Sequence, residues 1–191
     1  MTEEARLEDV GSGLAPVSGG WFVVNARDAA WLENDAFGAR CVFEADRRVL
    51  RERPDLDAQR FGETGFSLAV LAPGRPNGLY HAESAQEDFF VVAGECLLIV
   101  EGEERPLRAW DFVHCPADTA HIFVGAGDGP CVLLMIGART ADKRIVYPDS
   151  EPARRHGAGV ATETSSPAEA YAHHPHWRPR RRHGGSALPW G

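Results

Sequence analysis

The chain has 191 residues, 43% hydrophobic and 25% charged, a composition typical of one globular domain with extensions. Its formal net charge of −8 argues against a nucleic-acid-binding surface. The beginning, MTEEARLEDVGSG, lacks the apolar core of a signal peptide, and apolar runs such as CVLLMI, which starts at Cys131, are too short to cross a bilayer. We therefore expect a cytoplasmic protein that binds neither nucleic acid nor membrane.

The first third of the chain alternates between polar and apolar segments. The expected elements are a loose polar arm (1–20), a strand WFVVN (21–25), a short helix ARDAAWLEN (26–34), a strand ARCVFEA (39–45) and a charged surface loop (47–65). Asn25 could cap the helix, and Pro54 favours the loop.

From Gly65 onward, short apolar runs follow one another. They are FSLAVLA, GLYHA, DFFVVAG, ECLLIVEG, RPLRAWDFVHCP, AHIFVG and PCVLLMIGA, most of them bounded by Gly, Pro, Asn or Asp. Many short strands at such spacing indicate an all-β sandwich or barrel. No helix-length periodic segment interrupts them, which excludes a βαβ fold. We predict one β-barrel domain over residues 21–147.

The four cysteines are widely spaced, and each lies in or beside an apolar segment. They are Cys41, Cys96, Cys115 and Cys131. In a reducing compartment this pattern favours buried free thiols over disulfides, and the absence of a CxxC pair argues against a zinc ribbon.

Residues 148–191 form a C-terminal extension rich in Pro, Gly, His and Arg. Its one organised piece is SSPAEAYA, where Ser166 and Glu169 can form a capping box around a short helix. The remainder is either disordered or anchored along the barrel by Trp177 and Trp190.

Two stretches carry a resemblance to a known family. YHAESAQEDFFVVAGE (80–95), followed by RPLRAWDFVHCPADTAH (105–121), resembles the two signature motifs of the cupin superfamily. His81 fills the first histidine position of the first motif, Glu83 replaces its second histidine, and Glu87 precedes Gly94 by the expected interval. Pro116 and His121 match the second motif. The resemblance covers residues 66–137 and implies a double-stranded β-helix, or jelly-roll, barrel that is often dimeric and often holds one divalent metal ion.

The chain departs from these motifs at several positions. Trp110 and Asp118 stand where the second motif usually has glycine, and Gly125 stands in place of its terminal asparagine. Two spacings of the first motif remain open, and they differ in where its opening glycine would stand. In the shorter spacing this position is Arg75, whereas in the longer spacing it is Gly74. With the longer spacing, the ligand positions would fall on Tyr80 and Ala82, and His81 would face away from the site.

The candidate metal ligands combine imidazoles with carboxylates. His81 and Glu83 are two residues apart, so they share one face of a strand, while Glu87 begins the next strand and His121 comes from a distant one. The resemblance implies that His81, Glu83, Glu87 and His121 surround one divalent ion, with Glu83 either a ligand or a solvated acid. These ligand types suit Fe, Mn, Zn or Ni and do not choose among them.

Other basic residues favour simpler interpretations. His114 alternates with Phe112 on a predicted strand and is interpreted as structural. The tail histidines 173, 174 and 176 and the run RPRRR (178–182) are typical of a solvated tail.

The sequence predicts a metal-binding cupin, with a metal-dependent enzyme acting on a sugar derivative or organic acid as the first hypothesis. A dioxygenase, an isomerase or epimerase, and a decarboxylase all remain open, and no catalytic residue is assigned. The alternative is a non-catalytic protein that binds a small molecule. In either case we expect a homodimer.

Overall fold

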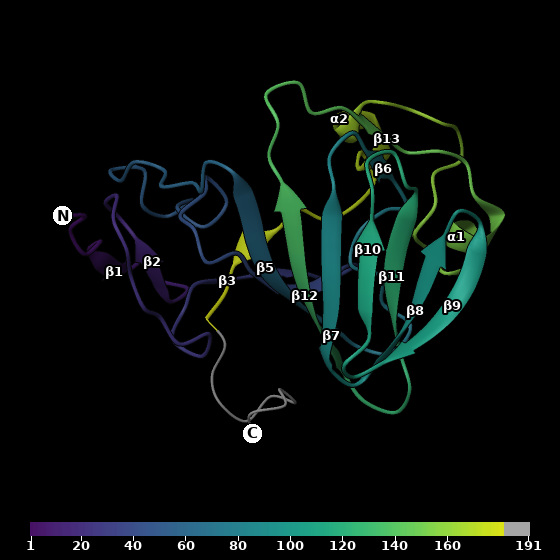
Figure 1. The fold of residues 1–191 in the computed structure, drawn as a ribbon, viewed down its shortest axis with the longest axis horizontal. Helices are drawn as coiled ribbons and strands as arrows, with labels where there is room; N and C mark the ends of the chain where they lie inside the picture. Colours follow the sequence, from purple (N-terminus) through teal and green to yellow (C-terminus); the bar gives the residue numbers. More distant parts are fainter. Residues whose placement is uncertain (182–191) are drawn as a thin grey trace.

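The computed structural model describes residues 1–181, which fold into two facing antiparallel sheets with smaller additions (Figure 1). The larger sheet contains, in spatial order, β10 (Phe112–Cys115), β7 (Glu87–Ala93), β12 (Cys131–Ala138), β5 (Thr64–Leu71), β4 (Gly38–Cys41), β3 (Trp31–Asn34) and β14 (Arg178–Pro179). The second sheet contains β11 (His121–Ala126), β8 (Glu95–Val100) and β9 (Glu103–Arg108). The predicted all-β, cupin-type jelly roll is confirmed.

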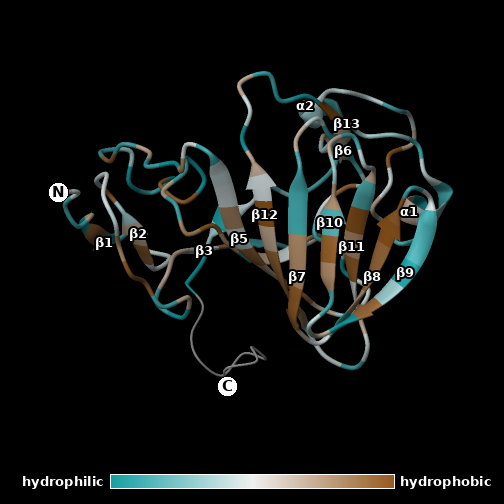
Figure 2. Ribbon diagram, viewed as in Figure 1, coloured by the Kyte–Doolittle hydropathy of each residue, from teal (hydrophilic) through white to brown (hydrophobic). Residues whose placement is uncertain are grey.

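Alternating burial along the strands builds the core between these sheets. In β7, Phe89 and Val91 are buried, and in β8 Leu98 is buried, as the period of two of a strand requires. They pack with Phe123 of β11 and Leu133 of β12. Figure 2 shows hydrophobic residues along β7, β8, β11 and β12, whereas β9 is mostly hydrophilic. Loops surround one end of this core and form the mouth of the barrel, where the residues of the two motifs meet.

The N-terminal region forms a packed hairpin instead of a loose arm. Its strands are β1 (Leu7–Asp9) and β2 (Leu14–Pro16). Val10 and Ala15 are buried in one cluster with Leu32, so the hairpin packs against β3 on the face that carries Leu32.

Two further predicted elements are wrong. Residues 21–25 are no strand; only Trp21 makes an isolated bridge. Residues 26–34 are no helix, because the Asn25 side chain accepts a hydrogen bond from the Arg27 N–H (2.9 Å) and starts a turn. Trp31 and Leu32 are then buried in different clusters on opposite faces of β3, an arrangement that a strand provides.

The C-terminal extension lies along the barrel as far as it is described. It contains α1 (Glu151–Arg155), capped by Ser150, and α2 (Pro167–Ala170). The Ser166 hydroxyl accepts from the Glu169 N–H (3.3 Å), as predicted, but the Glu169 carboxylate accepts from the Thr164 hydroxyl (2.5 Å) instead of closing a capping box. Trp177 is half-buried beside β14, which confirms the predicted anchor, whereas Trp190 lies outside the described residues.

Two short strands, β6 (Ala82–Glu83) and β13 (Ile145–Val146), pair with each other beside the mouth of the barrel. All four cysteines are free and buried, as predicted. Within residues 1–181, no helix has the length and apolar character needed to cross a membrane.

The motif departures keep the backbone conformation that glycine would adopt. Trp110 has φ 79° and Asp118 has φ 65°, both in the left-handed region. At Gly125, a Cβ atom would lie 2.3 Å from the carbonyl oxygen of Ala72, so only glycine fits there. The turns of the motif are therefore retained although two of their glycines are replaced.

We predict that Trp110→Gly is more stable than Trp110→Ala by about 1 kcal/mol, because only glycine adopts a positive φ without strain. Both variants lose the same exposed indole and its edge contact with Phe90, so the comparison isolates the backbone. Urea unfolding measures the difference, and equal stabilities would contradict it.

Candidate metal centre

An antiparallel bridge brings the two motif histidines together. His81 donates its backbone N–H to the His121 carbonyl (3.2 Å), and His121 donates to the His81 carbonyl (2.9 Å). Side chains of directly opposed residues project to the same side. The two imidazole centroids are accordingly 5.2 Å apart, although forty positions of sequence separate the residues.

Each imidazole is oriented by a hydrogen bond to the backbone. The Nδ1 of His81 lies 2.7 Å from the Leu79 carbonyl, and the Nδ1 of His121 lies 3.0 Å from the Thr119 carbonyl. A carbonyl only accepts, so each Nδ1 carries the proton and each Nε2 presents a lone pair. A bond of this kind to the other ring nitrogen is typical of metal-ligating histidines.

Glu87, the first residue of β7, completes a cluster of three possible ligands. Its Oε2 lies 3.5 Å from the Nε2 of His121 and 3.8 Å from the Nε2 of His81. The ligand atoms of the three residues all lie within 4.8 Å of one another. This Oε2 is buried, and no group in the described part of the chain donates a hydrogen bond to it. A cation with bonds of about 2.0–2.2 Å to nitrogen and oxygen would satisfy all three atoms.

Burial sets the protonation of this cluster. It lowers the pKa of His81 to about 3, with the neighbouring His121 as the second cause, and it also lowers the pKa of His121. Both imidazoles are therefore neutral at pH 7, the form that binds metal. Burial, followed by the charge of Glu83, raises the pKa of Glu87 to about 8. An ionised Glu87 thus requires a nearby cation.

Glu83 lies at the edge of the cluster. Its Oε1 is 3.9 Å from the Nε2 of His81, while its Oε2 forms an ion pair with Lys143. Lys143 is the chain's only lysine. This ion pair was not predicted from the sequence, although a single lysine among many arginines was a possible signal. Whether Glu83 is a fourth ligand stays a prediction.

The longer motif spacing does not match the side-chain directions. Tyr80 points away from the cluster and is buried against Ile99 and Ile122, and its hydroxyl accepts from the Gly102 N–H (3.2 Å). The histidine that follows it faces Glu87, as the shorter spacing predicts.

The remaining histidines lie elsewhere. His114 is half-exposed and pairs with Asp88 across β10 and β7 (2.7 Å), which agrees with a structural role. His174 packs against Phe37 and Tyr171. Within residues 1–181, the tail histidines join no metal-ligand cluster.

The cluster opens into a cavity of about 340 Å³ with a basic lining. Besides His81, Glu87 and His121, the residues that line the cavity include Arg40, Arg48, Arg60, Arg139, Lys143, Tyr147 and Tyr171. Arg40 was also missed from the sequence. A charged residue between two strand residues that are buried, Ala39 and Cys41, was the available signal.

Residues 67–137 match the family model of the cupin domain. This segment is therefore a cupin domain, and the three clustered residues all lie within it. No curated protein matches the chain.

Several solved structures are similar. A putative sugar phosphate isomerase from Acidithiobacillus ferrooxidans is 25% identical, with a TM-score of 0.45; the match covers 58% of this chain and 65% of that one. A sugar phosphate isomerase of the cupin superfamily from Silicibacter pomeroyi is 26% identical, with a TM-score of 0.43, over 56% and 63% of the two chains. A polyketide cyclase from Streptomyces resistomycificus is 12% identical, with a TM-score of 0.47, over 62% and 79%. The chain thus spans less than two thirds of the first two proteins.

We predict that Lys143→Met lowers the free energy of unfolding of the metal-free protein by roughly 1–2 kcal/mol, because it leaves the largely buried Glu83 carboxylate without its cation. The double variant Glu83→Gln/Lys143→Met should recover most of this loss. Urea titrations in the presence of a chelator measure both values. Additive effects of the two substitutions would show that the pair does not interact.

Proposed function

We propose that this cupin is a divalent-metal-dependent enzyme that acts on a small polar molecule, such as a sugar derivative or an organic acid. One observation carries the proposal: two neutral imidazoles, each fixed through Nδ1, turn their Nε2 atoms toward a buried carboxylate oxygen that receives no hydrogen bond from residues 1–181. Such a donor set has no evident structural purpose without a cation.

His81, Glu87 and His121 would hold the ion, with Glu83 as a possible fourth ligand. Two histidines and one carboxylate suit Fe(II), Mn(II), Zn(II) or Ni(II) and leave coordination positions for a substrate. When bound, such an ion supplies Lewis-acid polarisation of a substrate oxygen.

The surrounding residues fix this arrangement and offer proton-transfer groups. Phe89 packs edge-on against the His121 ring at 4.9 Å between centroids, and Tyr147 lies 5.9 Å from the His81 ring. These contacts restrict both imidazoles. The Glu83–Lys143 pair lines the same cavity, where the carboxylate can accept a proton from a bound molecule and the ammonium can donate one.

The first test is elemental analysis of protein purified without chelator or nickel resin. We predict about one divalent ion per chain, and loss of most of it in His121→Ala and Glu87→Gln, because each removes a ligand. His114→Ala, at a half-exposed histidine outside the cluster, is the control and should keep its metal. Full metal content in His121→Ala would contradict the assignment.

Whether a bound molecule is converted to a product distinguishes catalysis from simple binding. Mass spectrometry of sugar derivatives and organic acids incubated with the metal-loaded protein should reveal a converted product. A bound ligand that is always recovered unchanged would favour the non-catalytic alternative.

We also propose that two copies of the chain associate along β10. This strand ends the larger sheet, and among residues 1–181 no strand pairs with its outer edge. Trp110 and Phe112, which lie at this edge, are 80% and 62% exposed. A second copy would cover both the open edge and the exposed rings.

Light scattering should therefore give about twice the 20.8 kDa of one chain. Phe112→Asp should shift the protein toward the monomer because it places a charge in the apolar contact. Val23→Asp, at another exposed apolar position, is the matched control. A wild-type monomer at micromolar concentration would refute the dimer.

A further inference from the structure

A second cavity lies beside the candidate metal centre and is strongly basic. It has a volume of about 570 Å³, within the range of small-molecule sites. Four arginines line it, Arg40, Arg47, Arg48 and Arg51, together with the aromatic rings of Phe37 and Trp177. In the described chain, no aspartate or glutamate contributes to its wall. Such a concentration of positive charge is unexpected in a protein of net charge −8.

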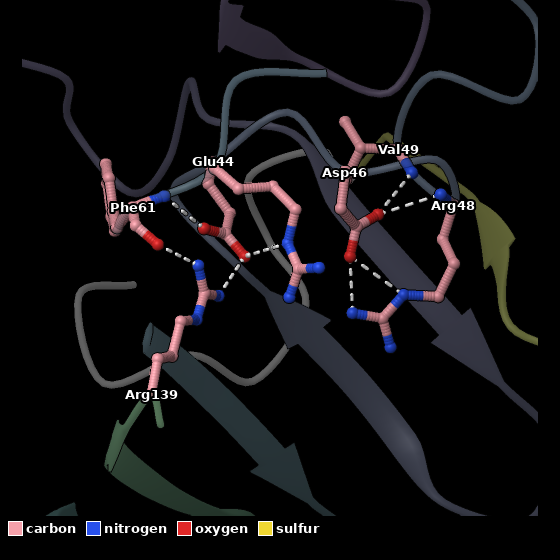
Figure 3. Close-up of polar contacts among 7 residues, drawn as sticks. Glu44, Asp46, Arg48, Val49, Phe61 and Arg139 are labelled. Atoms are coloured by element: carbon pink, nitrogen blue, oxygen red, sulfur yellow. Dashed lines mark hydrogen bonds and ion pairs between the residues drawn. The ribbon is translucent and has the colours of Figure 1, made fainter. Parts of the chain in front are cut away.

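Neighbouring arginines are neutralised, but most of those in this cavity are not. Arg139 pairs with the buried Glu44, and Arg48 pairs with Asp46, as Figure 3 shows. By contrast, Arg40, Arg47 and Arg51 form no ion pair with any carboxylate of residues 1–181. Three of the four arginines of this cavity therefore carry a positive charge that no ion pair within residues 1–181 neutralises.

Arg40 is the most constrained of these arginines. It extends from β4, donates through Nη2 to the Asn77 carbonyl (2.9 Å), and stacks with its guanidinium carbon 5.0 Å from the centre of the Trp177 ring. Its Nε is buried and finds no acceptor among residues 1–181. Burial also lowers the pKa of Arg40 to about 10. The stacking on Trp177 holds the guanidinium in place, and an oxygen acceptor would satisfy its unused N–H group.

The two cavities meet at Arg40. This residue, Arg48, Asn77 and Tyr171 line both of them. A molecule whose reacting end lies at His81 and Glu87 could therefore extend its other end toward Arg40. An arginine fork matches the paired oxygens of a phosphoryl or carboxylate group.

We propose that the arginine cavity binds the oxyanion group, phosphoryl or carboxylate, of the molecule whose other end reaches the metal centre. As a substrate subsite this inference rests on the proposed function, but the binding of the anion itself can be measured without metal. Arg40 is its central residue, and Arg47 and Arg51 add charge at the rim.

The test is calorimetric titration of the full chain, freed of metal by a chelator, with inorganic phosphate and separately with acetate. Arg40→Met keeps the length of the side chain and removes its charge. We expect it to weaken binding about tenfold or more, since a charge-assisted hydrogen bond contributes about 1.5–3 kcal/mol. Arg105→Met, at an exposed arginine on β9 that pairs with Glu103, is the control and should bind like wild type.

A second variant covers the case in which Arg40→Met fails to fold. Arg51 is exposed, so Arg51→Met should fold normally and still weaken anion binding by about threefold. Tighter binding of phosphate than of acetate would indicate a phosphoryl group, and the reverse order would indicate a carboxylate. Binding that is absent, or equal in wild type, Arg40→Met and Arg51→Met, would overturn the inference.

The same samples separate this inference from the proposed function. Anion binding that depends on Arg40, in a protein that never takes up metal, would support the anion site and refute the metal-dependent enzyme. Normal metal content without Arg40-dependent anion binding would leave the enzyme proposal intact and refute the anion site.

Discussion

The bridge between His81 and His121 is the constraint on which the site depends. It joins the segment before β6 to the start of β11 and presents both imidazoles on one face. Each ring then forms a hydrogen bond through Nδ1 to the backbone carbonyl two residues before it in the chain. A slip of one residue in this pairing would turn one imidazole to the opposite face of its strand. The Nε2 atoms would separate, and Glu87 would remain buried without a partner.

The parts of this site that were predictable from sequence are those that strand pairing encodes locally. His81, Glu87 and His121 lie at motif spacings, and the alternation around Phe89 and Val91 identifies the inward face of β7. Tyr80 shows what the sequence left open, because its burial against Ile122 selects one of two spacings. That contact joins residues far apart in the chain and has no local signature.

The N-terminal third was mispredicted for a related reason. Trp31 and Leu32 are adjacent, and both are fully buried. A strand with two buried faces shows no alternation, so the pattern was compatible with a short helix. The second covering layer comes from the β1–β2 hairpin and from Trp177, which lies about 145 positions away from these residues. Arg40 and Lys143 were missed because their significance likewise depends on distant partners.

The position of Trp177 gives the C-terminal extension a role beyond anchoring. Its ring forms one side of the arginine cavity and stacks on Arg40, while β14 directly after it pairs with β3. The extension thus separates the guanidinium from bulk water and lowers the dielectric constant around it. Cleavage of the chain before Trp177 would hydrate this cation. The electrostatic strength of the cavity is therefore set by a segment that belongs to neither signature motif.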